Sequence, residues 1–435
     1  MFRPWAMFAV LLTAVSASAD VRLVSHELPN GLRVVLAPAV TSPVTSSVTL
    51  SNVAIQIAFD GGSRQDAKAG TAWLANRIIA ARLPRIEAGV NQERAYLAAE
   101  VSLADLPKEL ARIAAALANR AVTDEEFAKT RDLLVREARE RGTAESSRVL
   151  LRRAYGPDGR NHESEVAPES VSRDDVQSFL RAHYAMRSAA LAIAGTFDEA
   201  QVMSAVRSAF APLAAGDAQR PCSVQPRQLK SEERQIIADA NMAESDVLIA
   251  YLTPQSTDRD WYALNILADI VGQGEGSRVR SGLTAAGLNA RFGEGMTESP
   301  CGSTLFKMRA RFNADVAASK VEAVIDEQLA RLSRDLVSDE ELALARKQEQ
   351  EWAASQLASA SGTANSMARV TLFYRDPERV NREVAAMQAV TAEDVRRVAR
   401  QYLRKENRVV VVTAREPAST SSHTTPRRTA APDRR

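Results

Sequence analysis

Histidine is a common choice for metal binding and proton transfer in proteins, and this chain of 435 residues contains four. Two imidazoles reach one metal ion from a helix when they are three or four positions apart, because such residues share a helical face. No pair among the four has that spacing: His26, His162, His183 and His423. We therefore expect surface or loop positions for them. No Gly-x-Ser-x-Gly motif indicates a serine nucleophile.

The two cysteines, Cys222 and Cys301, are too few to build a zinc site from thiolates. In an oxidising compartment they can form a disulfide. Two unpaired thiols are the alternative, and the sequence leaves it open because it does not fix the distance between the two Cα atoms. Neither cysteine has a histidine nearby in sequence, so a thiol nucleophile is not indicated.

Composition is that of an ordinary globular protein, with 45% hydrophobic and 25% charged residues. The 56 basic and 54 acidic side chains leave a net charge of +2. That balance gives no field strong enough to indicate nucleic acid as a partner. The length favours two domains over one.

Residues 1–19 have the pattern of a secretory signal peptide. Arg3 supplies a positive charge, an apolar stretch follows over 6–15, and Ala17-Ser18-Ala19 is an A-x-A cleavage site. The stretch is shorter than the ~20 residues of a membrane helix, and no later segment approaches that length. We predict a periplasmic or secreted protein without a stable membrane span. Retention of the segment as an N-terminal anchor is the alternative.

Two patterns occur twice, in the same order and at nearly the same offset, which indicates an internal repeat. Residues 123–127 and 338–342 each begin with Thr or Ser and carry Glu three positions on, the pattern of a capping box at a helix start. Residues 171–194 and 390–412 each predict a capped helix that leads through a tyrosine to a buried strand.

The repeat predicts two homologous domains, at 20–214 and 229–414, joined by a Gly- and Pro-containing linker at 215–228. The tail at 415–435 is rich in Ser, Thr, Pro and Arg and is predicted to be disordered. In each domain strands come first and long amphipathic helices follow. We therefore predict an α+β fold in which each domain is a mixed sheet with helices on one face.

Several short segments, in order over residues 25–413, resemble the pitrilysin/insulinase-type zinc metallopeptidases. The first is a Pro29-Asn30-Gly31 turn that leads into an alternating strand. The others are Gly62-Ser63-Arg64, Tyr155-Gly156 with 168–170, Gly276-Ser277-Arg278, and 372–374 with Asp376-Pro377. The resemblance implies half of a clamshell, as in mitochondrial processing peptidases, bc1 core subunits and two-subunit bacterial proteases.

Active members of that family carry an inverted zinc motif, H-x-x-E-H, on a helix. Its residues share one helical face, so two imidazoles bind the ion and the glutamate acts as general base. The resemblance places Trp73, Asn76 and Arg77 at these three positions. Indole offers no lone pair to a metal, an amide is no base at neutral pH, and a guanidinium repels a cation.

The family's third zinc ligand is a glutamate on a later helix, and Glu137 matches it. One carboxylate does not hold Zn²⁺, which takes three protein ligands in a catalytic site. The resemblance therefore implies zinc for the family but no cofactor for this chain. For Glu137 we keep two alternatives: an ion pair with Arg77 across the relic site, or an exposed glutamate with no special partner.

Active members also resemble one another in a substrate-binding Arg and Tyr, seven residues apart in the second domain. Here these positions fall on Thr284 and Arg291, or on Phe292 if one gap is allowed. The substrate-binding pair is therefore missing as well. Arg278, Arg280 and Arg291 remain candidates for contacting a peptide carboxylate or an acidic neighbour, and a solvated basic face is the alternative.

These losses predict a bacterial pseudo-metallopeptidase rather than an enzyme. The leading hypothesis is a non-catalytic subunit that forms a heterodimer with a zinc-bearing homologous peptidase and helps to form a peptide-binding or processing chamber. The second is an envelope scaffold or assembly protein. The third, an active zinc metallopeptidase, rests on fold analogy alone.

Overall fold

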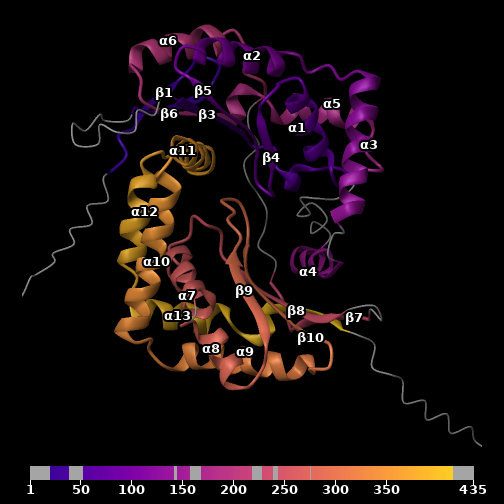
Figure 1. Ribbon diagram of the computed structural model, residues 1–435, viewed down its shortest axis with the longest axis vertical. Helices are drawn as coiled ribbons and strands as arrows, with labels where there is room; N and C mark the ends of the chain where they lie inside the picture. The colour runs from indigo at the N-terminus through magenta and orange to yellow at the C-terminus, as the bar shows by residue number, and fades with distance from the viewer. Residues whose placement is uncertain are drawn as a thin grey trace, which may run out of the picture. The chain divides into compact units, whose positions relative to one another are not determined.

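The computed structural model describes residues 20–38, 52–141, 145–156, 168–217, 228–238, 243–274 and 276–414. These residues form two compact units, each built around one mixed β-sheet (Figure 1). The first unit takes its described residues from 1–142, 161–221 and 346–390. The second takes them from 143–160, 222–345 and 391–435.

The first unit contains a six-stranded sheet in the order β1-β2-β6-β3-β5-β4. Neighbouring strands are antiparallel except β2 and β6, which are parallel. Strand β4 pairs with β5 alone among the described strands and therefore forms one edge. The strands are β1 (Val24–Glu27), β2 (Arg33–Pro38), β3 (Asn52–Phe59), β4 (Glu87–Val90), β5 (Ala95–Ser102) and β6 (Ala189–Gly195).

Large and small apolar residues alternate along the central strands of this sheet, so its two faces differ. Leu191 and Ile193 of β6 point into a core of large side chains, together with Ile55 and Ile57 of β3. The helices that cover this face are α1 (Thr71–Ala81), α2 (Leu106–Ala118), α3 (Asp124–Arg141), α5 (Arg173–His183) and α6 (Glu199–Phe210).

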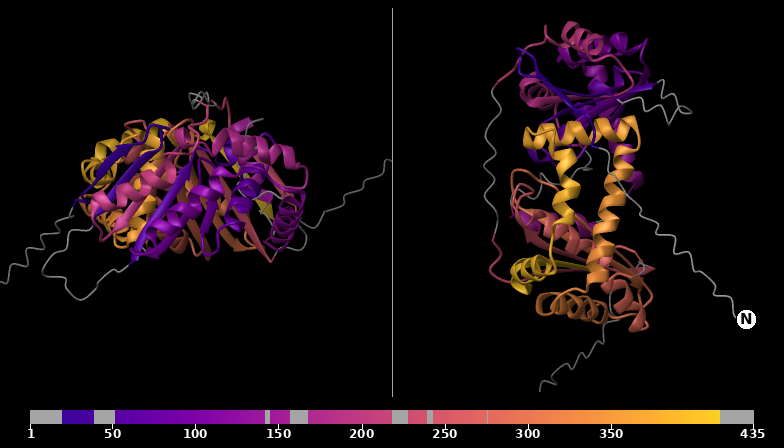
Figure 2. Two further views of the ribbon diagram at one scale, coloured as in Figure 1. Left: turned by 90° about the horizontal axis from the view of Figure 1, so that it is seen from above. Right: turned by 90° about the vertical axis from the view of Figure 1, so that its left-hand side faces the viewer.

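The other face of the first sheet is lined by small residues and is covered by a helix from the far end of the sequence. Ala190, Ala192 and Ala194 of β6 lie on this face. Helix α11 (Ala360–Tyr374) packs on them through Met367 and Leu372, and Figures 1 and 2 show it against this sheet. Because alanine side chains are short, α11 can lie close to the strands on this face. Helix α12 (Arg379–Gln388) follows α11.

The second unit contains a five-stranded sheet in the order β7-β11-β8-β10-β9. Without β1, this is the connection order of the first sheet, including one parallel pair, here β7 with β11. The correspondence agrees with the inferred repeat. The strands are β7 (Glu233–Ala238), β8 (Glu244–Thr253), β9 (Ala290–Met296), β10 (Thr304–Asn313) and β11 (Arg408–Ala414).

Helices lie on both faces of the second sheet as well. Helix α4 (Glu145–Tyr155), from the first half of the sequence, packs on one face through Leu150 and Ala154. Side chains of β8, β10 and β11 complete that cluster. The remaining helices of this unit, several of which contact the strands, are α7 (Trp261–Gly272), α8 (Arg278–Ala285), α9 (Ala318–Arg334) and α13 (Ala392–Tyr402). The unit boundary falls within α10 (Asp339–Leu357).

The predicted α+β class with mixed sheets is confirmed. The prediction that helices cover one face of each sheet was wrong, because α11 and α4 cover the second faces. The predicted continuous domains, 20–214 and 229–414, differ from the compact units. Residues 145–156 belong to the second unit and residues 346–390 belong to the first. Each exchanged segment supplies a helix to the face of a sheet that the local helices leave open. An amphipathic sequence pattern shows that a helix has a buried face, but not which sheet that face meets.

The helix starts within the repeat have the predicted caps. The amide of Glu126 donates to Thr123 Oγ1 at 3.2 Å and the amide of Thr123 donates to the Glu126 carboxylate at 3.0 Å. Ser338 and Glu341 make the same two bonds. Reciprocal boxes also start α5 at Ser172 and α13 at Thr391, and each of these helices leads to a buried strand, β6 and β11.

Several predicted features lie outside the described residues. They are the signal peptide at 1–19, the tail at 415–435, most of the linker, and His162, Cys222 and His423. A disulfide between Cys222 and Cys301 therefore stays a prediction. No helix in the described part of the chain is both long and apolar enough to cross a membrane.

The role of α11 can be tested at Met367, which is fully buried on the alanine face. We expect Met367→Ala to lower the free energy of unfolding by about 2–5 kcal/mol, because it leaves a cavity between helix and sheet. Urea denaturation measures this change. Leu344→Ala is the control, since Leu344 is 47% exposed and should shift stability by at most about 0.5 kcal/mol. Equal effects of both variants would argue against this packing.

Candidate functional site

Helix α1 carries the three residues that the sequence resemblance places at the family's zinc motif, and Asp66 caps the start of this helix. Its two carboxylate oxygens accept hydrogen bonds from the amides of Gly70 (2.9 Å) and Ala72 (2.7 Å). Gly70 has a φ of 91°, a left-handed conformation that suits glycine. Asp66 is 2% exposed, and burial raises the pKa of its carboxyl to about 7, although hydrogen bonds from Ala72 and Gly70 act to lower it.

Asn76, at the position of the family's general base, is completely buried and all its hydrogen bonds are internal. Its Nδ2 donates to the carbonyl oxygens of Gly89 (2.9 Å) and Tyr96 (3.3 Å), and its Oδ1 accepts from the hydroxyl of Tyr184 (3.0 Å). The amide thus joins α1 to edge strand β4 and to β5. A carboxylate cannot replace it, because an ionised carboxylate donates no hydrogen bond to the two carbonyl groups.

Arg77, at the position of the second histidine, forms an ion pair with Glu137 of α3. Arg77 Nη2 lies 2.9 Å from Oε1 and 2.8 Å from Oε2 of the carboxylate. The side chains are 35% and 25% exposed, so water screens the pair and its contribution to stability is small. Of the two alternatives for Glu137, the geometry supports the ion pair with Arg77. The fold brings these residues together from helices 60 positions apart.

Trp73, at the position of the first histidine, is part of the hydrophobic core. Its ring packs against the main core of the first unit. Its indole Nε1 is buried and has no hydrogen-bond partner among the described residues. An indole N–H is a donor only, so the ring contributes packing and no metal-binding atom.

The donor set of this site does not fit zinc. Trp73 and Arg77 offer no lone pair, the Asn76 amide is used by backbone carbonyls and a tyrosine, and the Glu137 carboxylate already binds a cation. Within the described residues no group of three or more His, Cys, Asp or Glu side chains could hold a metal ion. The two described histidines lie elsewhere: His26 near Glu199, and His183 against the carbonyl of Asp60.

The positions that match the substrate-binding pair lie in the second unit. Thr284 is exposed near the end of α8 and Arg291 is exposed on β9, where it pairs with Glu244. Phe292, the alternative for the tyrosine, is buried and 4% exposed. No arginine–tyrosine pair is formed by these residues.

The candidate arginines Arg278 and Arg280 have partners within the protein. Arg278 Nε and Nη2 lie 2.6 and 2.9 Å from the two carboxylate oxygens of Glu341, a bidentate ion pair next to the cap of α10. Arg280 Nε donates to the carbonyl oxygen of Gly272 at 2.8 Å. Both arginines thus contribute to the local structure, which argues against a role in binding a peptide carboxylate.

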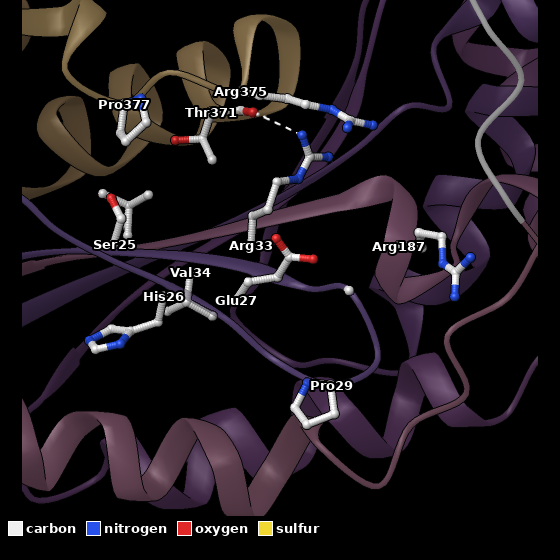
Figure 3. A pocket seen from close by; sticks show the side chains of 12 residues that line it. Ser25, His26, Glu27, Pro29, Arg33, Val34, Arg187, Thr371, Arg375 and Pro377 are labelled. Atoms are coloured by element: carbon white, nitrogen blue, oxygen red, sulfur yellow. Dashed lines mark hydrogen bonds between the residues drawn. The ribbon is translucent and has the colours of Figure 1, made fainter.

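A cavity of about 640 Å³ in the first unit was not expected from the sequence. It is lined by β1, β2, the segment before β6 and the end of α11, and it contains three arginines, Arg33, Arg187 and Arg375 (Figure 3). Arg33 Nη1 donates to the carbonyl oxygen of Thr371 at 3.1 Å. Burial and the charge of Arg375 lower the pKa of Arg33. Three distant segments supply the arginines, so no sequence motif marks this cavity.

Comparisons with known proteins agree with this geometry. Residues 170–349 match the family model for the peptidase M16 inactive domain. The chain is related to the M16 peptidases. The probable mitochondrial-processing peptidase subunit beta of Arabidopsis thaliana is 24% identical over 411 residues, which cover 86% of this chain and 75% of the plant protein. The family resemblance predicted from the sequence is thereby confirmed.

Solved structures share the M16-type fold. A protease from Helicobacter pylori superposes with a TM-score of 0.80 at 17% identity, over 91% of this chain and 99% of its own. The peptidase M16 inactive domain from Pseudomonas fluorescens superposes with a TM-score of 0.80 at 17% identity, over 92% of this chain and 99% of its own. A chain of complex III2 from Candida albicans superposes with a TM-score of 0.78 at 16% identity, over 90% of this chain and 95% of its own. At these identities the similarity establishes the fold alone.

The bonding of Asn76 can be tested by restoring the family's glutamate. We expect Asn76→Glu to lower the free energy of unfolding by about 2 kcal/mol or more, because it leaves two buried carbonyl groups unpaired and buries a carboxyl. Asn52→Glu is the control on exposed β3 surface and should have an effect within about 0.5 kcal/mol. Chemical denaturation of both variants measures the two changes in the free energy of unfolding. A stable Asn76→Glu protein that binds zinc would contradict our description of this site.

The raised pKa of Asp66 predicts a pH-dependent stability. The unfolded carboxyl titrates near pH 3.9 and the folded one near 7. The folded state therefore holds one more proton between these values, and this residue's contribution to stability falls as pH rises through that window. We expect Asp66→Asn to gain stability relative to the wild type between about pH 4 and 7, with no further change above pH 8. Urea denaturation at several pH values tests this. Parallel stability curves would count against the raised pKa.

Proposed function

We propose that this chain is a non-catalytic, peptidase-like subunit that pairs with a zinc-bearing M16 homologue. The observation that carries the proposal is the chemistry of α1. Asn76 is locked by three internal hydrogen bonds and Arg77 is paired with Glu137. These groups take the places where the family resemblance expects a general base and a metal ligand. The match to the M16 inactive domain supports the same conclusion.

Partner binding is supported by the kinds of proteins that share this fold. The plant relative is named as a subunit, and the Candida albicans chain is part of complex III2. We propose that this chain likewise works within an assembly. It would supply part of a chamber wall, and edge strands such as β4 and β9 to which an extended peptide can add. We propose a periplasmic or secreted location from the pattern of residues 1–19.

The test is co-purification with an M16 peptidase from the same source that has an intact H-x-x-E-H motif. We expect a stable complex by size-exclusion chromatography, and a peptidase rate for the complex that differs from that of the zinc subunit alone. Metal analysis of the separate chain should show no stoichiometric zinc. The proposal fails if no complex forms and the partner's rate is unchanged. Stoichiometric zinc with EDTA-sensitive cleavage by this chain alone would identify it as an enzyme.

A further inference from the structure

The second unit contains a groove of about 340 Å³ between α4 and the edge of its sheet. Leu150 and Leu151 of α4 form one wall, and Leu248 of β8 also lines the groove. The floor is formed by β10 and by edge strand β9, which pairs with β10 alone among the described strands. The groove is therefore apolar on one side and borders backbone groups of an unpaired strand edge on the other.

Two glycines keep the floor of the groove open. Gly295 lies opposite Lys307 and Gly293 lies opposite Arg309 across the β9–β10 pair. A Cβ added at either glycine would meet no atom within 4 Å. The first sheet gives a contrast: Gly89 of its edge strand lies opposite Tyr96, whose ring covers the glycine so closely that a Cβ would come within 2.5 Å of it.

The two cations in the groove have different surroundings. Arg309 is neutralised, because its Nε and Nη2 lie 2.7 and 2.6 Å from the carboxylate of Asp246. Lys307 is half-buried, and the described residues provide its ammonium group with neither a hydrogen bond nor an ion pair. Burial alone lowers the pKa of Lys307, with no acidic group to oppose the shift. Glu294 also lines the groove, but its carboxylate lies against Gly272 of α7. Among the described residues, Lys307 therefore has no counter-ion.

We propose that this groove binds the C-terminal segment of an extended apolar peptide, with its free carboxylate on Lys307. A carboxylate would supply the missing counter-ion, and a charge-assisted bond in a partly buried site is stronger than one in water. The open edge of β9 accepts a strand by main-chain hydrogen bonds. Gly293 and Gly295 leave room for the peptide's side chains, and Leu150 and Leu151 contact them. This inference names a ligand for the proposed peptide-binding function and rests on it.

The test compares two forms of one probe, an N-acetylated pentapeptide of Thr and Val that ends in Leu, as free acid and as C-terminal amide. Calorimetry on the full chain should show the acid binding at least about tenfold more tightly than the amide, because only the acid pairs with Lys307. Lys307→Met should abolish this preference and Lys307→Arg should keep it. Lys320→Met, on exposed α9, is the matched control and should keep it too.

A second variant tests the shape of the groove independently of the charge of Lys307. Gly295→Val has space for its side chain, so the protein should fold while the groove narrows beside Lys307, and both peptide forms should bind more weakly. The inference is overturned if neither form binds, if the wild type does not distinguish them, or if Lys307→Met keeps the preference. Binding of decanoate without binding of the peptide acid would also overturn it, in favour of a fatty acid.

The outcome is separable from that of the proposed function. Partner co-purification with Lys307→Met should match the wild type, since the variant changes only the groove. Loss of the acid preference in that variant, together with an intact complex, supports the inference. A wild-type chain that prefers the acid but forms no complex would contradict the pairing proposal and leave the groove assignment supported.

Discussion

Each sheet of this protein has two apolar faces, and water has to be excluded from both for the fold to be stable. The helices that follow the strands in sequence bury the face with the larger side chains. The second face is left to one helix, α11 on the first sheet and α4 on the second, and each comes from the other half of the sequence. This exchange makes the stability of each sheet depend on distant residues. It also leaves part of the second sheet, beside α4, as the groove that contains Lys307.

Helix α1 is held in place by hydrogen bonds within the protein and not by a metal ion. In the interior, Asn76 forms hydrogen bonds with the Tyr184 hydroxyl and with two backbone carbonyl groups. All the hydrogen bonds of Asn76 are therefore within the protein. Such a network holds α1 against strands β4 and β5, so the helix keeps its place without a metal. The Arg77–Glu137 pair lies nearer the surface and adds little stability by comparison. The site has become a structural junction between helix and sheet.

Charged side chains in this protein are commonly paired with a group of opposite charge. Most of the arginines considered above have an internal acceptor: Arg77 has Glu137, Arg278 has Glu341, and Arg309 has Asp246. Lys307 differs, because the part of the chain that the structure describes offers this half-buried lysine no counter-ion. In the arginine-lined cavity of the first unit, Arg33 already donates to Thr371 and the Glu27 side chain also lines the cavity. Glu294 lines the Lys307 groove, but its carboxylate lies against Gly272 instead. For this reason Lys307, and not that cavity, supports a statement about a ligand.

The sequence by itself determined the α+β class, the paired helix caps and buried strands, and the family resemblance. These follow from local patterns: Thr123 with Glu126 and Ser338 with Glu341 define helix starts whatever the rest of the chain does. It also indicated that Trp73, Asn76 and Arg77 are unsuited to zinc, because side-chain chemistry alone settles that. The sequence did not show which sheet α4 and α11 cover, that Arg278 binds Glu341, or that Lys307 lies opposite Gly295 across the β9–β10 pair. These are contacts between residues far apart in sequence, and no local periodicity carries information about them.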